Sequence, residues 1–395
     1  MPLDGVRVID CSRVLAGPYC GVLLAHLGAD VIKVEHLSGD EARSWPPHHG
    51  DMGASFLALN SGKRGIAVDL KSAGGSDVVH DLAAGADVLV ENFKTGDMER
   101  FGLGFDDLRA VNPRLVYTSI SAFGRRGPRA SDPGYEALLQ AYSGVMAITG
   151  ETDGRPVRCG VSFLDMATGT MAALATVTAL LRRTSTGRGG RVEASLLGTS
   201  VGLMSNAVSN YLQHGLQPPR HGSGHPQVVP YEAFATADGH VMIAAGNQNL
   251  YERLCRALDR RDLVDDPRFV DNPGRVEHRA ACVAAVAEAI RGWDTGDLIE
   301  RLGELGVPVS PVNDYESLMA DGQVDAIGVL ADGTDPAYGE VRLPALPFSL
   351  SGLDMATVGP APRLGEHTTE VLTDVLGYDD ARIGRLFADG VVGGV

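Results

Sequence analysis

The sequence predicts an α/β protein with a large domain on a mostly parallel sheet and a smaller α+β domain. Short apolar runs alternate with helical patterns over residues 6–125, and a stretch rich in Gly and Pro follows at 214–230. Beyond that stretch the pattern changes to a hairpin and consecutive helices. Strands alternating with helices imply right-handed βαβ units in a Rossmann-like arrangement, which binds ligands at the carboxyl ends of its strands.

The large domain is expected to open with a strand at 6–9, and Pro18 then suits the first turn of a helix. Further apolar runs complete the sheet, and a second helical region and a glycine-rich turn at 186–197 follow them. The further strands are expected at 29–35, 65–70, 86–93 and 114–123, and the helical region at 134–148 and 165–182.

The smaller domain is expected to begin with a hairpin at 231–246 that turns at Asp238-Gly239. Helical patterns at 248–258, 276–291 and 295–305 and a strand at 307–312 follow. Two helical segments, at about 366–376 and 379–389, end the chain. The predicted domains are 1–215 completed by 330–395, and 227–325, with linkers at 216–226 and 326–342.

Composition limits the classes of function. The 395 residues carry a net charge of -16, which argues against binding to nucleic acid or to an anionic membrane. Five widely spaced cysteines without a CxxC make a disulfide framework or a zinc site a poor explanation, and we expect no metal. The N-terminus enters a strand pattern without a signal peptide, so we expect a cytoplasmic protein.

The stretch from Cys159 to Leu181 places one carboxylate, Asp165, before an apolar run. The sixteen residues 166–181 fall short of the ~20 that span a bilayer, so a buried helix is expected. Asp165 suits its N-cap, and that structural explanation is sufficient for an ordinary Asp. The functional interpretation is a nucleophile, ionised at neutral pH without a helper base and made more reactive by partial burial.

Common cofactor motifs are absent from the sequence. The turn after the first strand reads AGPYCGVLLAHLG, which is not GxGxxG, so a nicotinamide dinucleotide is rejected as the primary ligand. There is also no P-loop, HExxH or GxSxG. His221 and His225 lie in a glycine-containing loop, where a metal-ligand role is improbable.

Basic and amide side chains recur where the expected strands end. Each is ordinarily a solvated surface group, but their recurrence at one edge of the sheet indicates a site for a phosphorylated ligand. These residues are Lys71, Asn92, Phe93 and Lys94, with Arg100 one or two helical turns further on.

In several segments the chain resembles the class III coenzyme A transferases, which include formyl-CoA transferase, carnitine CoA-transferase and α-methylacyl-CoA racemase. The resemblance covers essentially the whole chain. Its order and spacing are more specific than any one segment. The segments are PLDGVRVIDCSRVLAGPYCGVLLAHLGADVIKVE, NSGKRGIAVDLKS, ENFKTGDMERFGLG, LDMATG, TGRGGRVE, VPYEAFATADGHVMIAAGN and APRLGEHTTEVL.

The resemblance implies an acyl-CoA:carboxylate CoA-transferase. In the family, the residue matched by Asp165 forms an aspartyl anhydride and then an aspartyl-CoA thioester. CoA enters as a thioester substrate, with no tightly bound cofactor, alongside an organic acid. Family members are generally interlocked homodimers, and the same is expected here. The positions that match family contacts to CoA are Ala16, His36, Val68, Lys71, Asn92, Phe93, Lys94 and Arg100.

Some positions depart from formyl-CoA transferase. His36 stands where that enzyme has an arginine, and Leu15 replaces an active-site glutamine, which argues against oxalate–formate exchange. The match to its glycine-rich lid is Gly222-Ser223-Gly224, which is shorter.

Tyr135 matches an active-site tyrosine of the transferases, although a core aromatic is an equal explanation. The racemases need a His there as one of two bases, and a phenol is a poor substitute. Asn247 stands where they have an assisting Glu, so a 2-methylacyl-CoA racemase is the alternative and an inactive CoA-binding protein the remote one. Arginines that could bind a second substrate carboxylate are Arg125, Arg126, Arg155 and Arg158.

Overall fold

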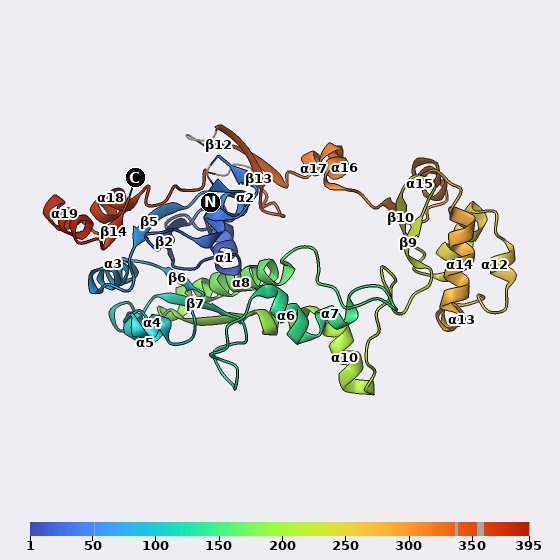
Figure 1. Cartoon of the computed structure of the whole chain (residues 1–395), viewed down its shortest axis with the longest axis horizontal. Coiled ribbons are helices and arrows are strands. Elements are labelled where there is room, and N and C mark those ends of the chain that lie inside the picture. Colours follow the sequence, from blue (N-terminus) through green and yellow to red (C-terminus); the bar gives the residue numbers. More distant parts are fainter. Residues whose placement is uncertain (51, 336–338, 354–358, 395) are drawn as a thin grey trace. The chain divides into compact units, whose positions relative to one another are not determined.

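A computed structural model describes residues 1–50, 52–335, 339–353 and 359–394 (Figure 1). Two compact units divide the chain between them. The first unit contains Met1–Val145, Cys159–His214 and Gln323–Val395, and the second contains Met146–Arg158 and Gly215–Gly322.

Within the described residues, the first unit is built on a seven-stranded sheet with the order β14-β5-β2-β1-β6-β7-β8. Its strands pair in parallel except for β14, which is antiparallel to β5. The predicted α/β fold with a mostly parallel sheet is therefore confirmed. The bounds are β1 Arg7–Asp10, β2 Asp30–Glu35, β5 Arg64–Val68, β6 Val88–Glu91, β7 Val116–Ser121, β8 Gly190–Ser195 and β14 Val392–Gly393.

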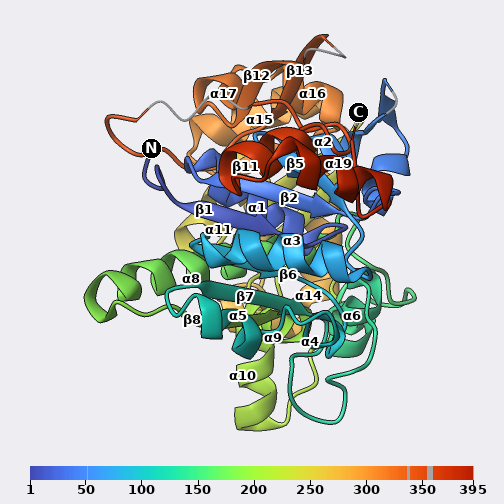
Figure 2. The ribbon, with the colours of Figure 1, turned by 90° about the vertical axis from the view of Figure 1, so that its left-hand side faces the viewer.

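Alternate side chains of the sheet enter two hydrophobic clusters, because successive residues of a strand face opposite sides. Val8 and Val88 belong to one cluster, whereas Ile9 and Leu89 belong to the other. Helices cover both faces of the sheet (Figure 2), which buries the parallel strands on both sides. The first cluster includes residues of α1 (Ala16–His26) and α8 (Phe163–Thr186), and the second includes residues of α3 (Ala73–Ala84) and α5 (Phe105–Val111).

Helix α8 begins at Phe163 and ends at Thr186, so it is longer than the predicted apolar run. The polar residues 182–186 continue the helix beyond the apolar run. The helix ends at Gly187, whose left-handed conformation is common at helix C-termini. By length and composition it could cross a membrane, a test that core helices also pass. It packs against α1, β7 and β8, but only part of its length is buried, so the predicted buried helix is confirmed in part. A Cβ at Gly169 would lie 2.6 Å from the carbonyl oxygen of Ala16, so α8 approaches α1 closely there.

The remaining elements of the first unit include two that the sequence prediction missed. The hairpin of β12 and β13 overlaps the predicted linker 326–342, because the apolar alternation of Val341 and Leu343 in β13 is too short to reveal it from the sequence. Residues 336–338, 354–358 and 395 of the predicted C-terminal segment lie outside the described residues. The bounds are η1 Glu41–Ser44, β3 His48–His49, β4 Met52–Gly53, α2 Ala54–Asn60, α4 Asp97–Arg100, α6 Glu136–Ser143, α9 Leu196–Leu203, α10 Ser205–His214, β12 Leu330–Asp335, β13 Gly339–Pro344, α18 Thr368–Glu370, η2 Val371–Val375 and α19 Asp380–Ala388.

The second unit has a three-stranded antiparallel sheet with the order β11-β10-β9 and its own buried core. Residues 146–158 belong to this unit, although the prediction placed them in the large domain. They are held by hydrogen bonds to the segment at Arg220–Gly222, which no periodic pattern reveals. The bounds are β9 Tyr231–Ala235, β10 His240–Ala244, α11 Gln248–Ala257, α12 Asp262–Asp265, α13 Asn272–Glu277, α14 Arg279–Ile290, α15 Thr295–Glu304, β11 Val309–Pro311 and α16 Tyr315–Ala320; α7 Val145–Ile148 and α17 Gly322–Ala326 span the unit boundaries.

Candidate active site

A pocket of about 360 Å³ lies in the first unit at the carboxyl ends of β1, β6 and β7. We call it the reaction pocket. The segment that follows each of these strands contributes to its wall, and the first turn of α8 adds Asp165. This is the position at which an open parallel sheet binds ligands. The predicted site residues that line it are Ala16, Asn92, Phe93, Lys94, Tyr135 and Asp165.

A second pocket, of about 320 Å³, lies at the carboxyl ends of β1, β2 and β5. We call it the nucleotide pocket, because the predicted residues His36, Val68 and Lys71 line it. Arg13, Glu41 and Phe93 line both pockets. The two pockets therefore adjoin along the edge of one sheet, an arrangement that suits a long ligand with its two ends in different surroundings.

Asp165 is the third residue of α8, so the predicted N-cap position is wrong. The helix starts two residues earlier, and Ser162 occupies the N-cap without a side-chain hydrogen bond. Burial, followed by the negative charge of Glu136, raises the pKa of the Asp165 carboxyl to about 7. The predicted ionisation at neutral pH used the pKa of an exposed Asp, whereas a pKa of about 7 leaves both the ionised and the protonated carboxyl present there.

Glu136 is a buried carboxylate beside the start of α8 that the sequence prediction missed. Its Oε1 accepts hydrogen bonds from Gln140 Nε2 at 2.6 Å and from the backbone N–H of Leu164 at 3.4 Å. The second contact satisfies one of the free amides of the first helical turn. Gln140 Oε1 in turn accepts from the backbone N–H of Cys159. Glu136 thus ties α6 to the segment that carries Asp165, a link between distant parts of the sequence.

Tyr135 precedes α6 and lines the reaction pocket with 66% of its surface exposed. The core-aromatic explanation is therefore wrong. Exposure of such a large ring at a pocket wall favours contact with a ligand.

Asn92 holds the backbone of Arg13 on both sides. Its Oδ1 accepts from Arg13 N at 3.0 Å, and its Nδ2 donates to Arg13 O at 2.7 Å. Arg100 is not among the residues that line either pocket; it is exposed and pairs with Asp97 on its own short helix. Asn92 therefore helps to fix the Arg13 backbone in the wall of the reaction pocket. Arg100, in contrast, lines neither pocket.

Arg125 lines the reaction pocket, but its guanidinium is buried and already paired. It donates to both carboxylate oxygens of Glu91, at 2.8 and 3.0 Å, and to the carbonyl oxygen of Phe93 at 2.9 Å. It is therefore a support for the β6 segment rather than a free partner for a substrate carboxylate. Arg155 and Arg158 belong to the second unit, and with the exposed Arg126 they stay a prediction as carboxylate ligands.

The predicted lid residues Gly222, Ser223 and Gly224 lie in the second unit. Gly222 has φ 61°, and a Cβ there would lie 2.7 Å from the Glu151 carboxylate, so both conformation and space favour glycine. Ser223 Oγ accepts from the backbone N–H of Ala233. Asn247 caps α11 by accepting from Leu250 N. A lid function stays a prediction.

The chain matches the model of CoA-transferase family III over residues 3–368. The chain belongs to CoA-transferase family III. It is 37% identical to a succinyl-CoA:glutarate CoA-transferase from Homo sapiens, in an alignment that covers 99% of this chain and 90% of that protein. It is 38% identical to a succinate–glutarate CoA-transferase from Agrobacterium fabrum, covering 95% and 96%.

A solved structure of a CaiB/BaiF family protein from Brucella suis matches this family member with a TM-score of 0.86 and 38% identity. That match covers 95% of this chain and 99% of the other. The relatives from Homo sapiens and Agrobacterium fabrum are named as CoA-transferases, so the enzyme class predicted from the sequence, an acyl-CoA:carboxylate CoA-transferase, is confirmed. Within the described residues of this member, no three His, Cys, Asp or Glu side chains gather as a metal site.

Proposed function

We propose that this protein moves coenzyme A from an acyl-CoA donor to a carboxylic acid through covalent intermediates on Asp165. The observation that carries the proposal is the place of Asp165 in the reaction pocket, which adjoins the nucleotide pocket. The nucleotide of CoA would occupy the pocket with Lys71 and His36, and its pantetheine arm would follow the shared residues Arg13 and Phe93. The thioester would then reach Asp165.

The reaction proceeds by acyl transfers alone. An oxygen of Asp165 attacks the thioester carbonyl, the C–S bond breaks, and an aspartyl anhydride and CoA thiolate form. The thiolate attacks the aspartyl carbonyl, which gives an aspartyl-CoA thioester and releases the donor carboxylate. The acceptor carboxylate attacks this thioester and forms a second anhydride and thiolate. Attack of the thiolate on the acceptor carbonyl yields the new acyl-CoA and regenerates the Asp165 carboxylate.

These steps transfer no proton, so the site needs an ionised carboxylate rather than a general base. Burial weakens the hydration of Asp165, and the pKa near 7 leaves a large ionised fraction at neutral pH. Leu15 at the N-cap of α1 and Ala16 in its first position line the same pocket, and the first backbone N–H groups of a helix have no partner within the helix. They are suited to stabilise negative charge on a carbonyl oxygen.

We propose dicarboxylates as the acids, because the relatives are named for succinyl-CoA and glutarate. A dicarboxylate has a second negative group that needs a partner. Arg13 and Lys94 are exposed cations in the wall of the reaction pocket. Either can contact an anionic end of such a substrate, whereas Arg125 is committed to Glu91.

The test is incubation of the protein in D2O with succinyl-CoA and a panel of mono- and dicarboxylic acids, and in a parallel reaction with a 2-methylacyl-CoA. Mass spectrometry should find new CoA thioesters of dicarboxylates, with no deuterium at the α-carbon. Deuterium uptake into a 2-methylacyl-CoA without CoA exchange would indicate the racemase instead. Binding of CoA without either reaction would indicate an inactive binding protein.

The proposal includes a homodimer. Helices α8 to α10 of the first unit carry large apolar side chains that are mostly exposed in one subunit, including Leu174 at 60%, Leu181 at 70% and Leu212 at 71%. Exposed apolar residues of this size favour an interface with another subunit. Light scattering coupled to size exclusion should give twice the mass of the chain, and a monomer at micromolar concentration would contradict this part of the proposal.

A further inference from the structure

The loop between β1 and α1, residues 11–15, is a wall common to both pockets. Cys11, Ser12 and Arg13 line the nucleotide pocket, and Arg13, Val14 and Leu15 line the reaction pocket. The backbone of this loop therefore determines where a ligand that runs through both pockets can lie.

Val14 occupies an unfavourable backbone conformation in this loop. Its φ is 71°, in the left-handed region that a β-branched residue strongly disfavours. A relaxed Val would leave that region and change the direction of the chain into α1. Interactions outside the loop must therefore hold it in place.

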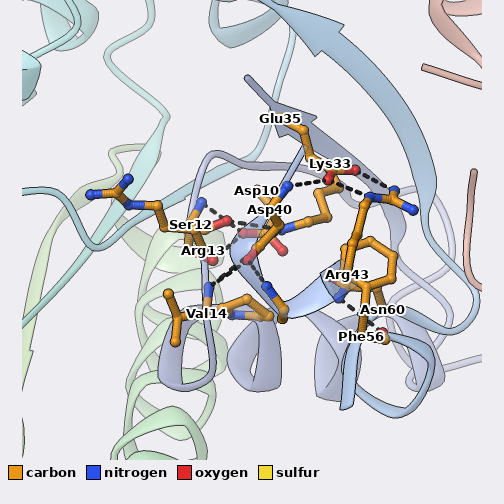
Figure 3. Close-up of polar contacts among 12 residues, drawn as sticks. Asp10, Ser12, Arg13, Val14, Lys33, Glu35, Asp40, Arg43, Phe56 and Asn60 are labelled. Atoms are coloured by element: carbon orange, nitrogen blue, oxygen red, sulfur yellow. Dashed lines mark hydrogen bonds and ion pairs between the residues drawn. The ribbon is translucent and has the colours of Figure 1, made fainter. Parts of the chain in front are cut away.

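The Asp40 carboxylate supplies that interaction (Figure 3). The backbone N–H of Val14 donates to both of its oxygens, at 3.2 and 3.1 Å. Oδ1 also accepts from the backbone N–H of Ala42 and so caps η1. One buried carboxylate thus joins the loop after β1 to the segment after β2.

Lys33 fixes both the carboxylate and the loop. Its ammonium group donates to Asp40 Oδ2 at 3.2 Å and to the carbonyl oxygen of Ser12 at 3.0 Å. The Lys33 side chain is fully buried and that of Asp40 is 1% exposed. An ion pair so far from water is held in one geometry, because either partner left alone would be a buried charge.

Further contacts hold both ends of this arrangement. The backbone N–H of Asp40 donates to Glu35 Oε2, and Arg43 donates to both oxygens of Glu35 at 2.8 and 2.6 Å. On the loop side, the backbone N–H of Ser12 donates to Asp10 Oδ1 at 3.0 Å. With the amide of Asn92 on Arg13, three consecutive loop residues are fixed by side chains of other segments.

We infer that Asp40, with Lys33, is a positioning pair that holds Val14 in its left-handed conformation and thereby sets the wall of the reaction pocket. The inference rests on the proposed CoA-transferase function. The contact of Gly169 with Ala16 links this wall to α8, one turn beyond Asp165. Displacement of the loop would move Leu15 and Ala16 relative to the carboxylate, and small misplacements cost much rate.

The test compares Asp40→Asn with Asp40→Asn/Val14→Gly. The amide NH2 of Asn must face either Lys33 or one of the backbone N–H groups, so the hold on Val14 weakens. We expect kcat to fall by about 10- to 100-fold. Glycine adopts φ 71° without strain, so kcat of the double variant should be at least about threefold higher than kcat of Asp40→Asn. If Asp40→Asn only lowered the stability of the protein, Val14→Gly would not raise kcat. The matched control is Asp87→Asn.

Asp87 is chosen as the control because it also accepts from a backbone N–H, that of Arg7, and pairs with a cation, Arg183. It lies at the amino end of β6, away from both pockets, so kcat should stay within about twofold of the wild type. Asp40→Glu keeps the charge opposite Lys33 but shifts the carboxylate, and it replaces Asp40→Asn if that variant does not fold.

The inference and the proposed function fail in different ways. Hydrogen exchange of the 11–17 amides needs no turnover and should be faster in Asp40→Asn than in the wild type and Asp87→Asn. Unchanged exchange together with unchanged kcat overturns the inference, as does the absence of rescue by Val14→Gly in folded protein. Absence of CoA exchange by the wild type overturns the proposed function instead.

Discussion

Asp165 is half-buried and Asp10 is fully buried in the first unit, and the neighbours of these two carboxylates give them opposite properties. Burial raises the pKa of both. At Asp10, Lys63 and Lys33 overcome this effect and hold the pKa below its usual range. At Asp165 the neighbouring charge is that of Glu136, which raises the pKa further. A paired buried carboxylate stabilises geometry, whereas one beside a like charge is left reactive.

The largest effect is expected from replacement of Asp165, the carboxylate that the comparison describes as reactive. Asp165→Asn should lower kcat on the order of 10⁴-fold or more, since an amide is not a competent nucleophile here. The surface variant Asp77→Asn, on α3, should keep wild-type turnover. Retention of substantial CoA exchange by Asp165→Asn would contradict the assignment.

The Asp165→Asn variant should be more stable than the wild type at pH 8. The folded-state pKa of about 7 lies above the ordinary value of 3.8, so the native state binds the proton more tightly. Stability from this group is full below pH 3.8 and is lost as pH rises towards 7. An uncharged Asn avoids that loss, which we expect to be on the order of 2 kcal/mol in urea denaturation at pH 8. Equal stability at pH 8 would contradict the raised pKa.

Lys63→Met should have the opposite effect on stability. Lys63 Nζ lies 2.8 Å from Asp10 Oδ2, and both side chains are fully buried. Removal of one partner leaves Asp10 with less compensation and should cost about 3–5 kcal/mol of unfolding free energy. Arg100→Met breaks an exposed pair with Asp97 and should cost less than about 1 kcal/mol. Similar losses in both variants would show that burial of the pair is not what matters.

The pH dependence of kcat/KM sharpens the comparison at the reactive carboxylate. The nucleophile is the ionised form, so the rate should rise about tenfold per pH unit below pH 7 and level off above it. Single-turnover kinetics with succinyl-CoA would measure this. A rate independent of pH between about 5.5 and 8 would contradict the raised pKa of Asp165.

The smallest change is expected from Glu136→Gln. Gln keeps the oxygen that accepts from Leu164 N but removes the negative charge beside Asp165. The pKa of Asp165 should fall, which moves the rise of the pH profile to lower pH. Gln140→Glu is the control: it adds a negative charge to α6 instead of removing one, so the rise of the pH profile should not move to lower pH.

The sequence predicts the sheet well because its signal is local. The strands β1, β2, β5, β6 and β7 are short apolar runs between helical patterns, and each was expected within a few residues of its observed position. Asp165 stood out because it is the one carboxylate ahead of a long apolar run. The pockets form where the ends of these strands meet, as open parallel sheets require.

The interactions that tune the site could not be predicted from local patterns. Glu136 affects Asp165, and Asp40 holds Val14, only because the fold brings separate segments together. Nothing in the sequence marks Val14 for a left-handed backbone, since β-branched residues disfavour it. Arg125 was one of four arginines that could bind a second substrate carboxylate, but its guanidinium is paired with Glu91 of β6.

The most direct test of the account is to trap the enzyme during turnover with succinyl-CoA, using hydroxylamine or borohydride, and to map the adduct by peptide mass spectrometry. We predict a hydroxamate or a reduced side chain at Asp165 in the wild type, and none at that position in Asp165→Asn. Label on another residue, or active enzyme without any label, would contradict acylation of Asp165.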